Sequence, residues 1–358
     1  MEADARCYGA VLRACAELGV ISTATTIFES IPQNMKNNLH LNSYLACLAH
    51  RSVVDIDRSF EVIKKYSYLV DIVTINTILS TCARSRAENS YNQAKSILAA
   101  LHDGKYGDIL PDVISYNNIL AACNLPNDCL ELVNEMRLSR KSRRFDYIEA
   151  SPVTYTNAIK ACSIDGKTLA KRNQTQSTPI AVTENYEAVK TLYEWSKVDG
   201  QSNYFVQSAF IYSMASFGAT ADIEEFIQSW DEIGGDQLLL YNSIFKSLSV
   251  KGVALDREHL SDRTKANKIK QYWSSLFADE VSPSEYTYRY LKRAIDSLEN
   301  GQNETINSVL KTVEDHGDFN GAIPIPDEFL NFVVRLFLKF GEEEVSFRSI
   351  PVSDLFIV

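Results

Sequence analysis

Residues 112–123 read Asp-Val-Ile-Ser-Tyr-Asn-Asn-Ile-Leu-Ala-Ala-Cys, and imperfect copies of this stretch return along the whole chain. Residues 71–82 read Asp-Ile-Val-Thr-Ile-Asn-Thr-Ile-Leu-Ser-Thr-Cys, and residues 151–162 read Ser-Pro-Val-Thr-Tyr-Thr-Asn-Ala-Ile-Lys-Ala-Cys. A shorter copy, Leu-Leu-Leu-Tyr-Asn-Ser-Ile-Phe-Lys-Ser-Leu, occupies residues 238–248. A motif that returns at intervals of about 33 to 52 residues is typical of a helical solenoid. The sequence therefore describes a repeat protein.

Each copy carries apolar residues at the spacing of a helix with one buried face. In the opening stretch these are Tyr116, Ile119, Leu120 and Cys123, which follow the i, i+3, i+4, i+7 pattern. A second helical pattern follows each copy, and each helix spans only about three turns. Such helices need stacked neighbours to be stable. We predict an all-α, right-handed superhelical solenoid of helix-turn-helix repeats.

The repeats are numbered so that the Tyr-Asn pair of the opening stretch occupies positions 4 and 5. This gives about eight repeats, at residues 5–37, 38–71, 72–112, 113–151, 152–203, 204–237, 238–284 and 285–326. Residues 327–358 are predicted to form a capping helix or part of a further repeat. Polar insertions at 163–184 and 251–264 separate the helices of two repeats, and the first is predicted to be a disordered loop. Neither insertion has a function that the sequence indicates.

Composition restricts the class of protein. The formal net charge of −10 over 358 residues disfavours non-specific nucleic-acid binding by the whole surface. The seven cysteines contain no Cys-x-x-Cys pair. Four of them share one register of the repeat and are predicted to be small core residues in a reducing compartment, without a disulfide or a metal. These four are Cys15, Cys82, Cys123 and Cys162.

The chain shows neither a membrane segment nor a targeting peptide. No apolar run approaches the roughly 18 residues needed to span a bilayer. The first residues lack the core of a signal peptide and the Arg/Ser-rich character of a transit peptide. Because the repeats begin almost at residue 1, we expect the sequence to be truncated.

Motifs for catalysis are missing from the sequence. The five histidines are dispersed and are predicted to lie at the surface or in turns. These are His40, His50, His102, His259 and His316. The His-x-Glu and Cys-x-x-Cys signature of zinc deaminases does not occur, and neither does a Gly-rich phosphate loop. We therefore expect no catalytic residues, no metal, no cofactor, no small-molecule substrate and no membrane partner.

Two further features have ordinary structural explanations. Trp195, Trp230 and Trp273 fall on second helices at buried spacing and are predicted to belong to the core. Residues 137–144 hold five basic side chains in eight positions. That run is either a solvated connection or a grip on a phosphate backbone or on the acidic surface of a partner.

The repeated stretch resembles the pentatricopeptide-repeat family. The resemblance is carried by Pro-Asp-Val-Ile-Ser-Tyr-Asn-Asn-Ile-Leu-Ala-Ala-Cys at 111–123 and by Leu-Val-Asn-Glu-Met-Arg at 132–137. It is close in repeats three and four and recognisable in one, two, five, six and seven. The nearest competitor, the tetratricopeptide repeat, has a Trp, Leu-Gly and Tyr pattern that is missing from this chain.

This resemblance implies that first helices line the inner face and that each repeat reads one base of single-stranded RNA. Position 5 and the last residue of the repeat would face the base edge, and position 2 would pack on base faces. The implied pairs are Asn42 with Asp71, Asn76 with Asp112, Asn117 with Ser151, Thr156 with Asn203, and Asn242 with Ser284. Position 2 is occupied by Leu39, Val73, Ile114, Val153 and Leu239.

The family's code gives these pairs a base preference, with Asn–Asp for U, Asn–Ser for C and Thr–Asn for A. Repeats two to five would then read U, U, C and A, and repeat seven would read C. Repeats one, six and eight depart from the pattern, with Gly9 and Asn37, Ser208 and Gln237, and Arg289 and Pro326. We assign these three repeats no base, and the unequal repeat lengths leave the register of the last residue open.

Position 9 lies one turn beyond position 5 on the same helical face and is basic in four repeats. The four residues are Arg13, Lys160, Lys246 and Arg293. An acidic protein can keep a locally positive inner face in this way, where each phosphate contact adds salt-dependent affinity. The alternative is four solvated charges on a helix surface.

The sequence thus predicts sequence-selective binding of single-stranded RNA. The resemblance implies a role in organellar RNA processing, stability or translation, in a mitochondrion or plastid, with an RNA-processing enzyme as a further partner. A protein-binding helical-repeat scaffold is the alternative, favoured by the acidic composition and the irregular repeats. A third is the RNA-binding half of a nuclease. A basic groove lined by Asn, Asp, Ser and Thr would favour RNA, and an acidic or apolar groove a peptide.

Overall fold

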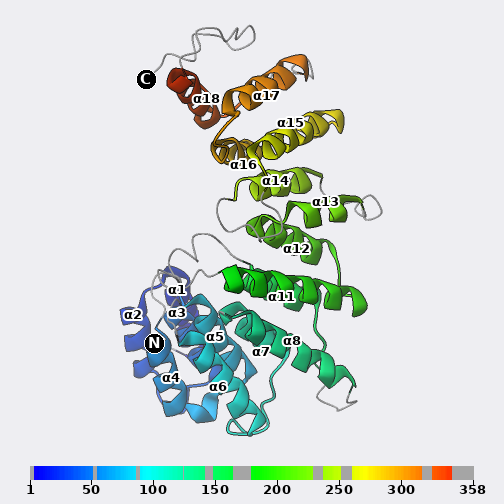
Figure 1. Cartoon of the computed structure of the whole chain (residues 1–358). Helices are drawn as coiled ribbons and strands as arrows, with labels where there is room; N and C mark the ends of the chain where they lie inside the picture. The colour runs from blue at the N-terminus through cyan, green and yellow to red at the C-terminus, as the bar shows by residue number, and fades with distance from the viewer. Residues whose placement is uncertain are drawn as a thin grey trace. The chain divides into compact units, whose positions relative to one another are not determined.

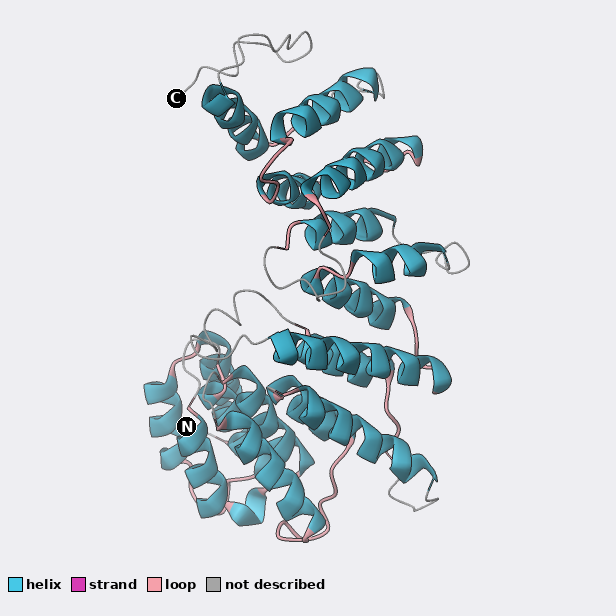
Figure 2. Ribbon diagram, viewed as in Figure 1, coloured by secondary structure: helices cyan, strands magenta, loops and turns pink. Residues whose placement is uncertain are grey.

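The computed structural model describes residues 4–50, 55–85, 89–123, 125–141, 148–163, 179–228, 237–250, 260–316 and 325–340. Within these ranges Figure 2 shows helices joined by loops and no strands. The predicted all-α class is therefore confirmed. The chain divides into two compact units, residues 1–162 with 190–206 and residues 163–189 with 207–358.

In the first unit, helices alternate between two layers (Figure 1). Each odd-numbered helix packs on the next odd-numbered one, from α1 to α3, α5, α7 and α9. The helices α1, α3, α5 and α7 also pack on the even-numbered helix that follows each of them. The helices are α1 (Ala5–Leu18), α2 (Ile21–Ser30), α3 (Asn38–Leu48), α4 (Ile56–Lys65), η1 (Ser67–Leu69), α5 (Ile72–Arg84), α6 (Ser90–His102), α7 (Val113–Ala122), α8 (Pro126–Lys141), α9 (Pro152–Cys162) and the second half of α11 (Pro179–Val198). The helical-hairpin arrangement follows from this alternation.

The first helix of each repeat in this unit begins at a side-chain cap. Asp71 and Asp112 precede α5 and α7, and each accepts a hydrogen bond of 2.8 Å from the backbone N–H three residues on. The hydroxyl of Thr74 or Ser115 in turn accepts a hydrogen bond from the backbone N–H of the capping aspartate, which completes a capping box. At the other end of a helix, Gly19 closes α1 with φ +68°, and a Cβ there would lie 2.5 Å from His50 Nδ1.

The core of this unit is formed largely by the faces that the periodicity predicts. Ile75, Ile78 and Leu79 on α5 are fully buried. Val11 occupies on α1 the place that Ile78 has in the i, i+3, i+4, i+7 pattern of α5, but it is exposed. The reason is that α5 lies between α3 and α7, whereas no described helix covers the corresponding side of α1.

The second unit repeats the arrangement. Here α14 packs on α16, α15 on α17, and α18 on both α16 and α17. The helices are α12 (Tyr204–Phe217), which begins at the division between the units, α13 (Thr220–Gln228), α14 (Gln237–Leu248), α15 (Asp262–Ala278), α16 (Glu285–Asp296), α17 (Gln302–His316) and α18 (Asp327–Phe340). Trp273 is fully buried in its core and donates from Nε1 to the Val309 carbonyl at 3.1 Å.

The first polar insertion is partly helical, which corrects the prediction of a disordered loop, and the second ends inside a helix. Helix α11 begins at Pro179 and α15 begins at Asp262, so residues 179–184 and 262–264 belong to helices. Residues 164–178 and 251–259 lie outside the described residues, as does His259.

The prediction for His40 is also wrong, because this side chain is buried between α1 and α3. Its Nε2 donates to the Ala5 carbonyl at 2.7 Å, and its Nδ1 accepts from the Asn37 backbone N–H at 3.3 Å. Position 3 of a first helix faces the preceding first helix, so a polar residue there is enclosed and must find partners.

The four cysteines that share a register are buried, as predicted for core residues. All seven cysteines of the chain are free thiols, and only Cys7 is exposed. Of the predicted core tryptophans, Trp273 is buried, Trp195 is half-buried, and Trp230 lies outside the described residues.

Across the described ranges, no helix has the length and apolar character to cross a membrane. The same ranges hold no cluster of three or more His, Cys, Asp or Glu side chains placed to bind a metal ion.

Candidate functional site

Two of the predicted pairs are joined by hydrogen bonds between adjacent first helices. Asn42 on α3 donates from Nδ2 to both carboxylate oxygens of Asp71, at 3.2 and 3.4 Å. One repeat later, Asn76 on α5 donates to both oxygens of Asp112, at 3.1 and 3.2 Å. The two pairs therefore have the same geometry at successive steps of the array.

A hydroxyl completes each of these pairs. Thr74 Oγ1 lies 2.6 Å from Asn42 Oδ1 and 2.8 Å from Asp71 Oδ1. Ser115 Oγ lies 2.7 Å from the oxygen of the Asn76 amide and 3.0 Å from Oδ1 of its aspartate. The hydroxyl thus fixes which way each amide points, so that its NH₂ group faces the carboxylate.

Hydrogen bonding also sets the charge of Asp71. Burial acts to raise the pKa of this carboxyl, but the bonds from the backbone and side chain of Thr74, and from Asn42 and Asn38, outweigh it. The pKa is therefore lowered from its ordinary value of 3.8. The side chain is a carboxylate that accepts hydrogen bonds near neutral pH.

The last residue of each predicted pair has a structural role that the sequence analysis missed. All five accept a hydrogen bond from the backbone N–H three residues on, and so cap the following first helix. The five are Asp71, Asp112, Ser151, Asn203 and Ser284. The signal in the sequence is an Asp or Ser followed three positions later by Thr or Ser, which marks four of these five caps.

The remaining three pairs are not joined. Asn117 makes no hydrogen bond to Ser151, Thr156 makes none to Asn203, and Asn242 makes none to Ser284. Instead, Asn117 Oδ1, Thr156 Oγ1 and Asn242 Oδ1 are buried without a hydrogen-bond partner among the described residues. The structure thus brings together two of the five predicted pairs.

Position 2 carries an apolar side chain on the surface of successive first helices. In α3, α5, α7 and α9 these side chains are 54% to 66% exposed; they are Leu39, Val73, Ile114 and Val153. Leu239 on α14 is half-buried. Two aromatic residues that were not predicted occupy the same position, Phe205 on α12 and Tyr286 on α16, and they are 67% and 60% exposed. Comparing position 2 in the irregular repeats would have found them.

The basic residues at position 9 differ in their exposure. Arg13, Lys160 and Arg293 are exposed. The Lys246 ammonium group lies 3.1 Å from the centroid of the Tyr212 ring and donates to Ser216 Oγ at 2.6 Å. Lys246 is therefore held by α12 in a cation–π contact.

Position 6 adds a link between first helices that the sequence analysis missed. Asn118 Nδ2 on α7 donates to the Asn76 carbonyl at 3.1 Å, and Asn157 Nδ2 on α9 donates to the Asn117 carbonyl at 3.5 Å. The second asparagine of the Tyr-Asn-Asn stretch thus joins neighbouring repeats.

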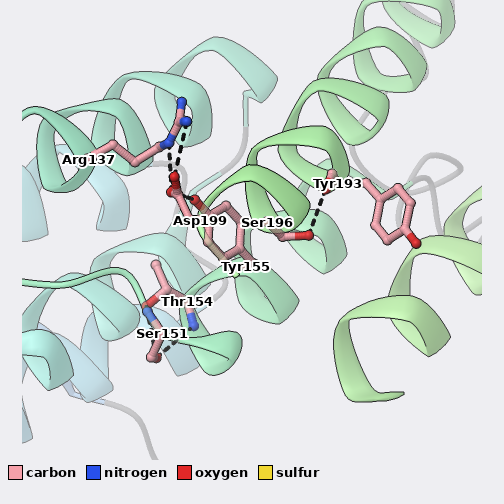
Figure 3. Close-up of polar contacts among 7 residues, drawn as sticks. All are labelled: Arg137, Ser151, Thr154, Tyr155, Tyr193, Ser196 and Asp199. Carbon is pink, nitrogen blue, oxygen red and sulfur yellow. Dashed lines mark hydrogen bonds and ion pairs between the residues drawn. The ribbon is translucent and has the colours of Figure 1, made fainter. Parts of the chain in front are cut away.

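The basic stretch at 137–144 begins inside α8, and its first residue is paired within the protein. Figure 3 shows Arg137 facing Asp199, and its Nε and Nη2 donate to the two carboxylate oxygens at 2.8 and 3.2 Å. Tyr155 on α9 donates its hydroxyl to the same carboxylate. The guanidinium group also lies 4.6 Å from the Trp195 ring. Arg137 therefore binds α8 to α9 and α11. Residues 142–144 of the stretch lie outside the described residues.

Comparison with known proteins yields solved structures alone. No protein-family model and no curated protein matches the chain. The similar structures include the pentatricopeptide repeat protein PPR10 in complex with an 18-nt psaJ RNA element, and a triple cysteine-to-serine variant of PPR10 in the same complex. Each is 16% identical, with a TM-score of 0.40, and the match covers 96% of this chain and 55% of the other. The chain thus spans about half the length of the structures that it matches.

Proposed function

We propose that the chain binds single-stranded RNA sequence-selectively along the exposed face of its first helices. The observation that carries this proposal is the repetition of one arrangement at two successive steps. An exposed aliphatic side chain, Leu39 or Val73, lies one helical turn before an asparagine that is hydrogen-bonded to the next helix's aspartate.

Helix capping does not account for this arrangement. Asp71 needs only the Thr74 backbone N–H to cap α5, and Ser151 caps α9 with no bond to an asparagine. Capping also gives no reason for large apolar side chains at position 2 to be exposed in four successive repeats. Base recognition explains both features, because base faces pack on apolar groups and base edges need fixed donors and acceptors.

The chemistry of the joined pairs suits a base edge. Each aspartate presents acceptor oxygens, and each asparagine amide has its direction fixed by a hydroxyl. An acceptor of this kind pairs with an N–H group of a base. The family's preference for U at Asn–Asp pairs, which we carry over to repeats two and three, agrees with this chemistry.

Phosphate contacts would come from the exposed residues of position 9, Arg13, Lys160 and Arg293. Each such contact releases counterions and makes binding salt-dependent. The protein would act as a clamp that holds a short RNA segment open, shields it from nucleases or presents it to an RNA-processing enzyme. An organellar setting, mitochondrion or plastid, rests on the resemblance of the repeats alone.

The test is the affinity for a short RNA containing U-U-C-A, measured beside a scrambled strand over a series of salt concentrations. Asn76→Ala removes one reader and should reduce the preference for the U-U-C-A strand. Asp112→Ser is the matched variant, because serine caps α9 and α16 in this same chain. It should keep the fold while moving the preference at that position from U towards C.

Equal binding of the two strands, unchanged by Asn76→Ala, would refute sequence-selective reading. A failure to bind any RNA, together with binding of a peptide, would move the function to a protein-binding scaffold.

A further inference from the structure

Helix α16 carries an aromatic ring and two arginines on one face. Tyr286, Arg289 and Arg293 occupy positions 2, 5 and 9, and their spacing of three and four residues aligns them along the helix. The Tyr286 side chain is 60% exposed, and the Arg289 guanidinium carbon lies 5.2 Å from the centre of its ring. Arg293 is exposed one turn further on.

This face lacks the short amide or hydroxyl side chain that position 5 carries in the repeats assigned a base. On α5, positions 2 and 5 hold Val73 and Asn76, and the asparagine both donates and accepts hydrogen bonds. On α16 the same positions hold Tyr286 and Arg289. The Arg289 guanidinium group, which could otherwise contact a base edge, is paired with Glu285 and lies beside the Tyr286 ring. An aromatic ring stacks on any base. The α16 face is therefore suited to hold a nucleotide without reading it.

The basic side chains of α16 differ in their partners. Arg289 pairs with Glu285 on the same helix at 2.7 Å. Lys292 turns towards α18, where it pairs with Glu328 at 3.3 Å. Arg293, the next residue, makes no ion pair with any described residue. Its guanidinium group is thus available to an anion from outside the protein.

We infer that Tyr286, Arg289 and Arg293 form a sequence-independent nucleotide site on α16. A base of single-stranded RNA stacks on the Tyr286 ring, beside the guanidinium group of Arg289, and a phosphate binds Arg293. The two ends of the site are separated by about 10 Å along the helix, a distance that the long arginine side chain shortens. The inference rests on the proposed function, because the ligand is the same RNA.

The position of α16 in the array indicates which nucleotide of the RNA its site would hold. Helix α16 packs on α14, which carries Asn242, and Ser284 immediately precedes α16 as its cap. The predicted pair Asn242 and Ser284 therefore borders this face. The nucleotide held on α16 is the neighbour of the one assigned to that pair, and it anchors the strand beyond the bases that are read.

The test compares two strands of equal length and charge, an RNA containing U-U-C-A and a fully abasic phosphodiester strand. Tyr286→Ala should weaken binding of the RNA about tenfold and leave binding of the abasic strand unchanged, since stacking needs a base. Tyr286→Phe keeps the ring and should restore the affinity. Arg293→Gln should weaken binding of both strands and reduce the salt slope by about 0.7.

Lys292→Gln is the matched control, because it removes the same charge from a neighbouring side chain that faces Glu328. It should leave the affinity and the salt slope unchanged. Equal losses in Arg293→Gln and Lys292→Gln would overturn the inference in favour of bulk charge. Helical content by circular dichroism verifies that each variant is folded.

The outcomes separate this inference from the proposed function. If the wild-type chain prefers U-U-C-A and the Tyr286→Ala variant binds that RNA as tightly as the wild-type chain does, the α16 site is refuted and the proposed base-reading pairs are retained. If Tyr286→Ala and Arg293→Gln lose affinity as expected while Asn76→Ala changes nothing, the α16 site stands and selective reading fails. Binding to a peptide but to neither strand refutes both.

Discussion

Asp71 and Asp112 occupy equivalent places, yet their carboxylates are not equally open to a ligand. Asn38 donates from Nδ2 to Asp71 Oδ2 at 2.7 Å. The residue equivalent to Asn38 in the next repeat is Ile72, which cannot donate from its side chain, so Asp112 lacks this bond. A base that approaches the first of these aspartates must compete with the Asn38 amide.

We therefore expect Asn38→Ala to increase the affinity for U-U-C-A RNA, because it frees an acceptor in the repeat proposed to read the first U. The gain should be about two- to tenfold, the usual net value of one hydrogen bond. Equilibrium binding measures it, with C-U-C-A RNA as the control strand. An equal gain on both strands would show that Asn38 does not affect the reading of that base.

The lowered pKa of Asp71 predicts a pH dependence of stability. Because the folded-state pKa lies below the ordinary value of 3.8, the carboxylate stabilises the fold above that pH and loses its effect as the pH falls through the folded value. Asp71→Asn cannot ionise but can still cap the helix. Urea unfolding at about pH 6 and pH 3 should show a smaller loss in the variant than in the wild-type chain.

The two proteins should therefore become more similar in stability on acidification. A loss of the same size in both would mean that Asp71 has the same pKa in the folded and unfolded states.

Between elements, a polar cluster around Asp199 joins α8, α9 and the end of α11 in the first unit. Its side chain is 15% exposed and that of Arg137 is 19% exposed, so neither charge is well solvated. Removing one partner leaves the other charge buried and unpaired, which is more costly than the pair itself is favourable.

Asp199→Ala should therefore reduce the free energy of unfolding by about 3 kcal/mol, and a double variant with Arg137→Met should recover part of it. Chemical denaturation of the single and double variants measures both values. Tyr155→Phe is the milder control and should cost about 1 kcal/mol, since it removes one hydrogen bond. A double variant less stable than either single one would contradict this account.

The helices of this protein could be predicted from the sequence more fully than the contacts between them. The helices and their buried faces follow from periodicity, because stacking on both sides encloses residues such as Ile78. Val11 differs only in lacking a neighbour, which no local pattern reveals. His40 was wrongly placed because a polar side chain at position 3 can be buried once two backbone groups satisfy it. Asn118 and Asn38 bond across helices, and their partners depend on a register that the chain does not state locally.

In the whole molecule, the two compact units carry different side chains whose exposure can be used to follow unfolding. All seven cysteines lie in the first unit, six of them buried, and Trp273 lies in the core of the second. Burial raises the pKa of the Cys82 thiol to about 11, so this group is unreactive in the folded state. Thiol labelling therefore reports on one unit and Trp273 on the other.

We expect one fast thiol, Cys7, and six that react only on unfolding. Ile78→Ala should destabilise the first unit by about 3 kcal/mol and bring forward the exposure of the six thiols. The fluorescence transition of Trp273, followed in a chain without the other tryptophans, should move less, because repeats are coupled mainly to their neighbours. Equal shifts of both signals would show that the two units unfold together.

The capping role of the residues that we propose as base readers limits how the specificity of this protein can change. Every residue that ends a predicted reading pair also starts a helix, and the five are aspartate, serine or asparagine. A mutation to a new specificity survives only if the new side chain still begins the next helix. The residues available for base recognition at these positions are thus limited to those that can cap a helix. A change of RNA target must therefore use one of a few short polar residues.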